Sequence, residues 1–231
     1  MEFRIGDQTS GLDDSSYESG DYESSPNGGD FSPKRLFDIV VASIALVFVS
    51  PLLLIIGLAI RLQDGKPALY SQPRWGFHGE TFECFKLRSM VPNAAEKLQA
   101  VLDADPEAKR EWDLTQKLTD DPRITPLGKF IRATSIDELP QLLNIIRGDM
   151  SIVGPRPIPL YERSKYGEDF VHYCSVRPGL TGLWQISGRS NTTYSERIEL
   201  DKRYVQSRTF WGDIGIMLKT VPAVLFSVGA K

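Results

Sequence analysis

A 22-residue segment without a charged side chain, residues 39–60, constrains the fold of this chain more than any other feature. A straight helix of that length would reach ~33 Å, enough to span a bilayer core of about 30 Å. An uninterrupted apolar run of this length fits a membrane better than the core of a soluble protein. The segment therefore predicts that the protein contacts a membrane.

A Ser50-Pro51 pair near the middle of this segment predicts a kink. Proline removes one helical hydrogen bond and its ring clashes with the carbonyl of Val47, while Ser50 can bond back to a freed carbonyl. Each arm would then be only ~15–18 Å long, too short to cross alone. Basic residues stand at both ends of the segment, so the flanking charges do not favour placing its two ends on opposite sides of the membrane. We predict a re-entrant membrane helix over residues 33–62, with a kinked single span as the alternative.

Charge is distributed unevenly along the chain. The net charge is −3, but residues 1–32 hold eight acidic residues and one basic residue, so the remainder carries +4. The first 32 residues are also rich in Ser and Gly, and we predict a disordered acidic tail. A mildly basic body suits phosphate ligands or an anionic membrane surface. No nucleic-acid-binding motif is present, and we expect no nucleic-acid partner.

The few cysteines and histidines exclude several kinds of site. Cys84 and Cys174 lie far apart without metal-ligand spacing, so we expect reduced packing residues. His78 and His172 are the only histidines, which argues against a histidine-based metal site or catalytic triad.

Two adjacent acids, Asp137 and Glu138, form the most informative polar motif. Ser135 with Glu138 three residues later has the spacing of a capping box, and apolar residues follow at helical spacing. The acids could therefore be helix-start residues only. Neighbouring helix positions point about 100° apart, however, and a helix start keeps a carboxylate ionised. The pair could therefore supply a nucleophile and a metal ligand, and both interpretations remain open here.

Basic residues recur in segments expected to be rigid. Lys86 and Arg88 lie two apart at the end of a predicted strand, 81–87, and would face the same side of it. Arg156 stands between two prolines, including Pro157, that restrict the backbone. Arg189 follows a glycine turn. Each could contact phosphate; the alternatives are a solvated strand face and ordinary turns.

The remaining pattern predicts the other elements. A first strand, 68–72, pairs with the second through a turn-rich connection, and residues 94–119 form two surface helices with a break at Asp105-Pro106. Thr125-Pro126 starts a helix that carries Arg132. We expect a strand over 183–186 and a helix over 196–208. An apolar stripe that includes Trp211 and Leu218 would lie either in the membrane interface or in the core.

Taken together, these segments resemble the bacterial sugar transferases, the monotopic phosphoglycosyl transferase family, over about residues 33–228. The motifs that carry the resemblance are Lys34-Arg35-x-x-Asp38, Ser50-Pro51, Lys86-Leu87-Arg88-Ser89-Met90, Asp121-Pro122-Arg123-Ile124-Thr125, Asp137-Glu138-Leu139-Pro140-Gln141, Gly148-Asp149-Met150-Ser151, Gly154-Pro155-Arg156-Pro157 and Arg177-Pro178-Gly179-Leu180-Thr181-Gly182. In length the chain is most similar to the exopolysaccharide-initiating hexose-1-phosphate transferases.

The resemblance implies a fold and a location. The fold would be α/β, mostly helical with a small β-hairpin or sheet, in a monotopic membrane protein with interfacial amphipathic helices. Residues 1–32 would be the tail, 33–62 the re-entrant helix, and 63–231 a cytoplasmic catalytic domain with a C-terminal interfacial helix. The protein would sit in the bacterial inner membrane with this domain on the cytoplasmic face, and a homodimer is compatible with the family.

The resemblance also implies a reaction. A UDP-sugar, with galactose or glucose as the hexose, would give its sugar-1-phosphate to undecaprenyl phosphate and release UMP. Asp137 would be the nucleophile and form a phosphosugar-aspartyl intermediate, and Glu138, next to Asp137, would hold Mg²⁺. The family's phosphate-contacting cations match Lys86, Arg132, Arg156 and Arg189, and Arg88 and Pro157 join them as candidates.

Two other functions stay open at this point. One is a non-catalytic membrane adaptor of a polysaccharide assembly complex, and the other is an enzyme that moves a different group onto a lipid phosphate. The sequence by itself names neither the hexose, nor the nucleotide base, nor the oligomeric state.

Overall fold

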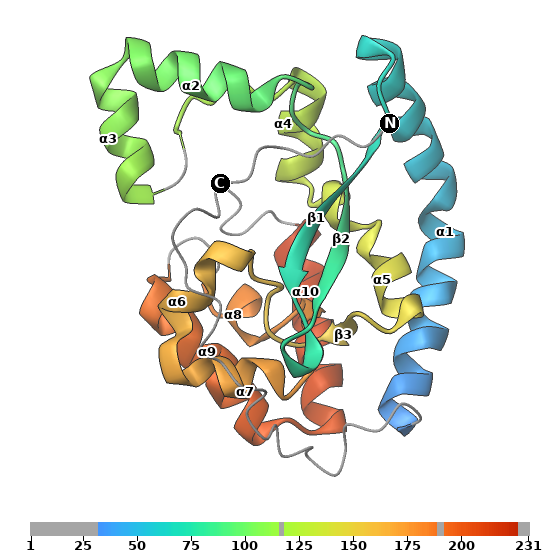
Figure 1. Ribbon diagram of the computed structural model, residues 1–231. Coiled ribbons are helices and arrows are strands. Elements are labelled where there is room, and N and C mark those ends of the chain that lie inside the picture. The colour runs from blue at the N-terminus through green and yellow to red at the C-terminus, as the bar shows by residue number, and fades with distance from the viewer. Residues whose placement is uncertain (1–31, 116–117, 189–191, 226–231) are drawn as a thin grey trace.

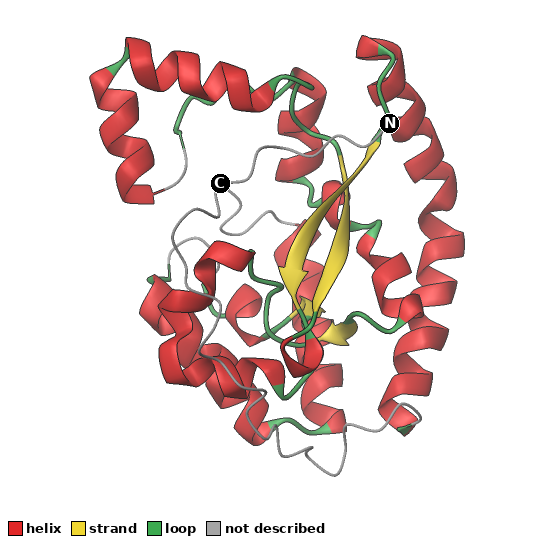
Figure 2. Ribbon diagram, in the orientation of Figure 1, coloured by secondary structure: helices red, strands yellow, loops and turns green. Residues whose placement is uncertain are grey.

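The computed structural model describes residues 32–115, 118–188 and 192–225. The predicted acidic tail, apart from Ser32, lies outside these residues, and so does Arg189. Within them the molecule is mostly helical, with two small two-stranded sheets (Figure 2). This agrees with the predicted α/β class in which helices dominate.

The apolar segment forms one long helix, α1 (Pro33–Asp64), along one side of the molecule (Figure 1). Ser32 caps its start by accepting a hydrogen bond from the Arg35 N–H at 3.2 Å, and Gly65 ends it in the left-handed conformation. In the part of the chain that the structure describes, it is the one helix long and apolar enough to cross a membrane.

Much of α1 is not covered by the rest of the molecule. Ala42, Ile56 and Ile60 are buried against the body. Large apolar side chains on the other face stay exposed, with Phe48 at 85% and Val47 at 74%. A water-soluble protein rarely leaves so large an apolar surface uncovered, so this face is suited to lipid.

Pro51 lies inside α1, and the helix is continuous on both sides of it. The Ser50 hydroxyl donates to the Val47 carbonyl at 2.9 Å, the carbonyl that Pro51 cannot serve because it lacks an N–H. This confirms the predicted back-bonding. Figure 1 shows that α1 bends along its length. The re-entrant hairpin stays a prediction about how this helix sits in a membrane.

A β-hairpin follows α1, as predicted. Strands β1 (Leu69–Trp75) and β2 (Thr81–Leu87) pair antiparallel, from Leu69 opposite Leu87 to Trp75 opposite Thr81. The first strand is longer than predicted because the chain continues to pair up to Trp75. A short 3₁₀ turn, η1 (Phe77–Gly79), connects the strands.

The charged stretch forms the two predicted helices, α2 (Ala94–Ala104) and α3 (Pro106–Thr115), which stand apart from the body at the upper left of Figure 1. Helix α4 (Pro126–Ala133) begins as predicted, because the Thr125 hydroxyl accepts from the Gly128 N–H at 2.9 Å.

The second sheet pairs two short parallel strands, β3 (Ser151–Val153) and β4 (Gly179–Thr181). Between them the chain runs through small helical elements, namely η3 (Leu160–Glu162), α6 (Arg163–Tyr166), η4 (Gly167–Asp169) and α7 (Phe170–Cys174). The predicted strand over 183–186 was wrong, because these residues form the short helix α8 (Leu183–Ile186). Four apolar and polar residues after a glycine are too few for periodicity to separate strand from helix.

The chain ends in two helices, α9 (Tyr194–Ser207) and α10 (Phe210–Leu225). Thr193 and Glu196 form a reciprocal capping box at the start of α9. In α10 the predicted apolar stripe divides. Met217 is partly buried against the core, whereas Trp211 and Leu218 are 79% and 69% exposed, so only part of the stripe packs inside.

The largest core cluster joins α1, α5 (Gln141–Arg147), β3, α9 and α10. Cys84 belongs to it and Cys174 belongs to a second cluster, and both are buried and free, as predicted. The core therefore holds α1, the hairpin and the β3 segment in fixed positions around one polar pocket.

Candidate active site

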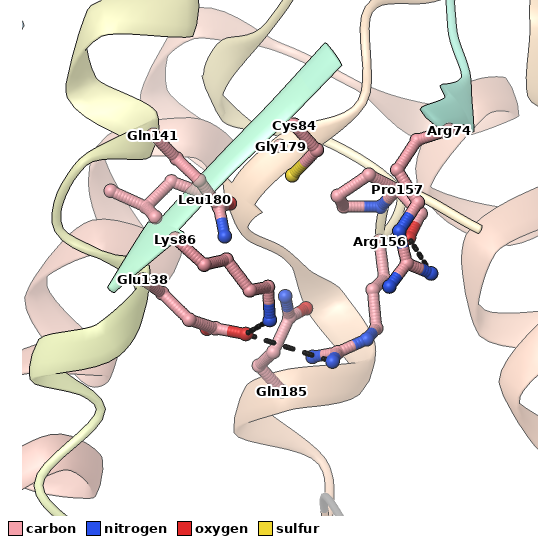
Figure 3. A pocket seen from close by; sticks show the side chains of 10 residues that line it. All are labelled: Arg74, Cys84, Lys86, Glu138, Gln141, Arg156, Pro157, Gly179, Leu180 and Gln185. Carbon is pink, nitrogen blue, oxygen red and sulfur yellow. Dashed lines mark hydrogen bonds and ion pairs between the residues drawn. The ribbon is translucent and has the colours of Figure 1, made fainter. Parts of the chain in front are cut away.

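A small polar pocket lies where the hairpin, Glu138 of the acid pair and the loop after β3 meet, and Asp137 is not among its lining residues (Figure 3). Its lining residues come from five separate segments of the chain: Arg74, Cys84, Lys86, Glu138, Gln141, Arg156, Pro157, Gly179, Leu180 and Gln185. The pocket therefore brings Glu138 together with three of the six predicted phosphate-binding residues, Lys86, Arg156 and Pro157.

Glu138 stands between two cations in the pocket. The Lys86 Nζ lies 2.9 Å from its Oε1, and the Arg156 Nη2 lies 3.6 Å from the same oxygen. Burial raises the pKa of Glu138, but the charges of Lys86 and Arg156 outweigh it and lower the pKa to about 2. Glu138 is therefore an ionised carboxylate whose charge is already compensated.

Asp137 has a different electrostatic setting. Burial and the negative charge of Glu138 raise the pKa of Asp137, against the opposing effect of Lys86, Arg132 and Arg156. A carboxylate with a raised pKa is more basic and a better nucleophile than one held down by ion pairs. The two neighbouring acids are thus suited to different tasks.

The acid pair is not held by a capping box, and that prediction was wrong. Ser135 adopts the left-handed conformation with φ 57°, makes no side-chain cap, and is followed by the 3₁₀ turn η2 (Ile136–Glu138). Helix α5 begins only at Gln141. The Ser135 N–H instead bonds to the Arg132 carbonyl at 3.1 Å and closes the end of α4. The acids therefore lie in a tight connection between two helices.

Arg156 is presented by a loop that backbone contacts hold rigidly. The Gly154 N–H donates to the Thr181 carbonyl at 2.9 Å, and the Gly179 N–H donates to the Pro155 carbonyl at 2.7 Å. A Cβ on Gly179 would lie 2.1 Å from the Gly154 nitrogen, so only glycine allows this approach. The loop that carries Arg156 is therefore held by pairing with the β4 segment as well as by the two prolines that the sequence shows.

The other predicted cations lie outside the pocket lining. Arg132 donates through Nε to the Ser89 hydroxyl at 2.8 Å, and its charge acts on Asp137. Arg88 is not among the residues that line the pocket. It lies just past the end of β2 and binds Asp64 with two hydrogen bonds of 2.5 and 2.6 Å. Arg88 therefore ties the end of α1 to the hairpin. Arg189 falls outside the described residues.

Arg74 lines the pocket but was missed by sequence reasoning. It lies on β1 opposite Phe82, and Gln72, two residues earlier, lies opposite Cys84. Cross-strand neighbours share a face, so Arg74 and Lys86 point to the same side of the hairpin. The register of the hairpin, had it been assigned, would have revealed this residue.

The donor set fits Mg²⁺. This ion prefers oxygen ligands and usually takes one or two carboxylates together with substrate phosphates and water. Asp137 and Glu138 supply such carboxylates, and the described residues hold no larger cluster of metal-ligating side chains. An ion bound here would therefore share its remaining positions with substrate and water.

Fixed cations around an adjacent acid pair, in a protein with one long exposed apolar helix, define an anion-binding site suited to phosphoryl chemistry. The comparison with known proteins makes the class specific. The bacterial sugar transferase family model matches residues 30–227, and the chain belongs to this family.

Several relatives are similar over most of this chain. An uncharacterized sugar transferase of Haemophilus influenzae is 49% identical over 197 residues, which cover 85% of this chain and 42% of that protein. An undecaprenyl-phosphate galactose phosphotransferase of Salmonella typhimurium is 48% identical over 85% of this chain and 41% of its own length. The exopolysaccharide production protein ExoY of Rhizobium meliloti is 46% identical over 89% of this chain and 90% of its own length. This chain thus spans about two fifths of the first two proteins and nearly the whole of the third.

Proposed function

We propose that this protein transfers a hexose-1-phosphate from a UDP-sugar to undecaprenyl phosphate, releases UMP, and so starts the assembly of an exopolysaccharide repeat unit. Galactose and glucose are the hexoses we expect. The names of the Salmonella and Rhizobium relatives support this reaction. The observation that carries the proposal is the acid pair, with Glu138 ion-paired to Lys86 and Arg156 and with the more basic Asp137 beside it.

The reaction would take two displacements at one phosphorus atom. In the first, an Asp137 oxygen attacks the phosphorus that carries the sugar, and the bond to the UMP oxygen breaks, so UMP leaves with the electron pair. In the second, an oxygen of the lipid phosphate attacks the same phosphorus and the Asp137 carboxylate leaves. Lys86 and Arg156 would stabilise the charge on the phosphoryl oxygens in both steps.

A bound Mg²⁺ would supply further neutralisation of phosphate charge. Glu138, with Asp137, would hold it. Glu138 would then exchange its ion pairs for the metal, and Lys86 and Arg156 would become available to the substrate phosphates. The same carboxylate that compensates the two cations before binding would thus release them when substrate arrives.

The proposed location follows from α1. Its exposed apolar side chains and the Ser50 bond at Pro51 support a re-entrant helix that enters and leaves the inner membrane on the cytoplasmic face. The exposed Trp211 and Leu218 of α10 would lie in the interface of the same leaflet. Such an arrangement would place the pocket within reach of a lipid phosphate.

The reaction is tested with purified protein in nanodiscs that contain undecaprenyl phosphate, with Mg²⁺ and either UDP-galactose or UDP-glucose. Release of UMP and formation of lipid-linked sugar diphosphate are expected. Asp137→Asn should abolish both turnover and the covalent intermediate, a loss of several powers of ten at ~1.4 kcal/mol each. Glu138→Gln should stay folded and change the Mg²⁺ dependence. No UMP release with any UDP-sugar would favour the adaptor, and a phosphosugar adduct on another residue would overturn the role of Asp137.

The topology is tested with a single cysteine placed at position 20 in intact cells, since both native cysteines are buried. A re-entrant α1 predicts that this cysteine is protected from a membrane-impermeant reagent. Replacing Ser50-Pro51 by Ala-Leu should straighten α1 and expose the cysteine in a fraction of molecules. Labelling of the cysteine in the unchanged helix would show a spanning form instead.

A further inference from the structure

The pocket holds three cations, and they are compensated unequally. Lys86 and Arg156 both lie within 4 Å of the Glu138 carboxylate. Arg74 makes no ion pair within the described residues. Its guanidinium donates instead to the Gln72 Oε1 at 2.7 Å and to the Pro157 carbonyl at 3.4 Å. Arg74 is therefore a positive charge in the pocket wall that is held by neutral hydrogen-bond partners.

The surroundings of Arg74 favour a bound anion. Burial and the positive charge of Arg156 lower the pKa of the Arg74 guanidinium, with partial opposition from Cys84, Tyr161 and Glu162. Of these two cations only Arg156 pairs directly with Glu138, and a phosphate group bound by both guanidinium groups would offset their mutual repulsion.

A role in stability alone does not account for this side chain. The backbone already joins β1 to the loop after Arg156, because the Trp75 N–H donates to the Ile158 carbonyl at 3.0 Å. Arg74 and Pro159 also form a backbone bridge. The Arg74 side chain adds one hydrogen bond of 3.4 Å to these contacts, which is weak by the usual geometric criteria.

The position of Arg74 relative to the acids is specific. Figure 3 shows Glu138 on one side of the pocket and Arg74 on the other, with the end of Arg156 between them. In an in-line phosphoryl transfer, the attacking and leaving oxygens lie on opposite sides of the phosphorus. Asp137 directly precedes Glu138 in the chain, so an attack by Asp137 from the Glu138 side would place the leaving group on the side of Arg74.

We propose that Arg74 binds the phosphate of the leaving nucleotide and stabilises the charge that develops on it as UMP departs. This inference rests on the proposed function and adds a residue to it. The hydrogen bonds to Gln72 and Pro157 orient the guanidinium and leave further N–H groups of its five donors for the ligand. Arg74 then acts in the step that releases UMP. In the step in which the lipid phosphate attacks, the UMP phosphate is no longer present for Arg74 to bind.

The test separates these two steps in the full-length protein in nanodiscs. Arg74→Gln should raise the KM for the UDP-sugar and the inhibition constant of UMP at least tenfold, and slow formation of the covalent intermediate. The covalent intermediate of this variant, once it has formed and UMP has been removed, should react with undecaprenyl phosphate at an unchanged rate. Arg110→Gln is the matched control, because Arg110 lies on the outlying helix α3 in an exposed pair with Glu107.

Arg74→Lys keeps the charge and tests the geometry. We expect an intermediate rise in the inhibition constant of UMP, because an ammonium group cannot form the paired bonds of a guanidinium. This variant also carries the test if Arg74→Gln fails to fold. Unchanged UMP inhibition in a folded variant, or equal slowing of both steps, would overturn the role of Arg74 while leaving the proposed function intact. Absence of UMP release in the unaltered protein would overturn both.

Discussion

At the scale of single residues, Asp137 and Glu138 are neighbours with opposite electrostatic surroundings. The cations at Glu138 lower its pKa to about 2, while burial and the charge of Glu138 raise the pKa of Asp137. The lowered pKa of Glu138 contributes stability that is present above its unfolded value of 4.5 and is lost as the pH falls toward 2. Glu138 therefore stays ionised over the whole physiological pH range, and its charge keeps Lys86 and Arg156 in place.

Ser135 gives a first prediction at this scale. Because it makes no cap and has φ 57°, Ser135→Ala should lose much less than the ~1 kcal/mol of a true N-cap. Ser135→Val should destabilise the protein by roughly 1–2 kcal/mol, since a β-branched residue tolerates the left-handed conformation poorly. Thermal unfolding of both variants checks this. A larger loss for Ser135→Ala than for Ser135→Val would show that the hydroxyl matters more than the backbone.

Asp201 gives a second prediction, on pH. It is buried in α9, where it accepts from the Tyr166 hydroxyl at 2.8 Å, and burial raises its pKa to about 7 despite the nearby Arg197. The folded state therefore keeps this proton up to about pH 7, whereas the unfolded chain releases it near 3.8. Stability should fall as the pH rises through this window, because the unfolded state binds fewer protons.

Asp201→Asn keeps an acceptor for Tyr166 and removes the titration. We expect the variant and the unaltered protein to melt at similar temperatures near pH 4, and the variant to melt several degrees higher at pH 8, at about 2–4 °C per kcal/mol. Melting curves across this range decide the matter. Parallel curves for the two proteins would show that Asp201 is already ionised near pH 4.

At the scale of elements, the β3–β4 pair decides where Arg156 lies. Gly179 has no space for a Cβ, so Gly179→Ala must displace Gly154 and the loop that carries Arg156. We expect a loss of several kcal/mol in stability, as for other overpacked core positions, and a weaker affinity for UMP. Gly215→Ala on α10 is the control, because nothing lies within 4 Å of its Cβ and alanine favours the helix. A tolerated Gly179→Ala with unchanged UMP binding would contradict the close approach.

At the scale of the whole molecule, the start of α1 is fastened to distant segments by buried polar contacts. The Lys34 Nζ lies 2.8 Å from the Asp213 Oδ2 of α10, and the Ser151 hydroxyl of β3 donates to the Asp38 Oδ2 at 2.7 Å. The Tyr204 hydroxyl contacts the Asp213 Oδ1 at 3.0 Å. Helix α1, the strand before the Arg156 loop and helix α10 are thus joined at one point.

Removing Lys34 should therefore affect the whole fold. Lys34→Met leaves the buried Asp38 and Asp213 without their cation, and we expect a loss of about 3 kcal/mol. Adding Asp213→Asn should recover part of it. Lys202→Met is the control, because the Lys202–Asp169 pair is about one third exposed on each side and should contribute under about 1 kcal/mol. Denaturant unfolding of these three variants and the unaltered protein would measure the effect, and equal losses at Lys34 and Lys202 would contradict it.

The sequence by itself determined the elements whose signals are local. The uncharged run 39–60, the alternation before Leu87, the Thr125 cap and the Asp105-Pro106 break each predicted a structure that forms where expected. Such signals depend on residues within a few positions of each other, so they can be interpreted without knowledge of the packing.

Only the tertiary structure decided which charges meet. Lys86 and Glu138 are 52 positions apart, and the pairing of Arg88 with Asp64 instead of a site anion depends on where β2 ends against α1. Arg74 lies in the pocket because of the hairpin register. Ser135 does not cap a helix, and its N–H instead bonds to the Arg132 carbonyl at the end of α4. These outcomes follow from the relative placement of distant segments, which burial of the common core fixes and which no local spacing encodes.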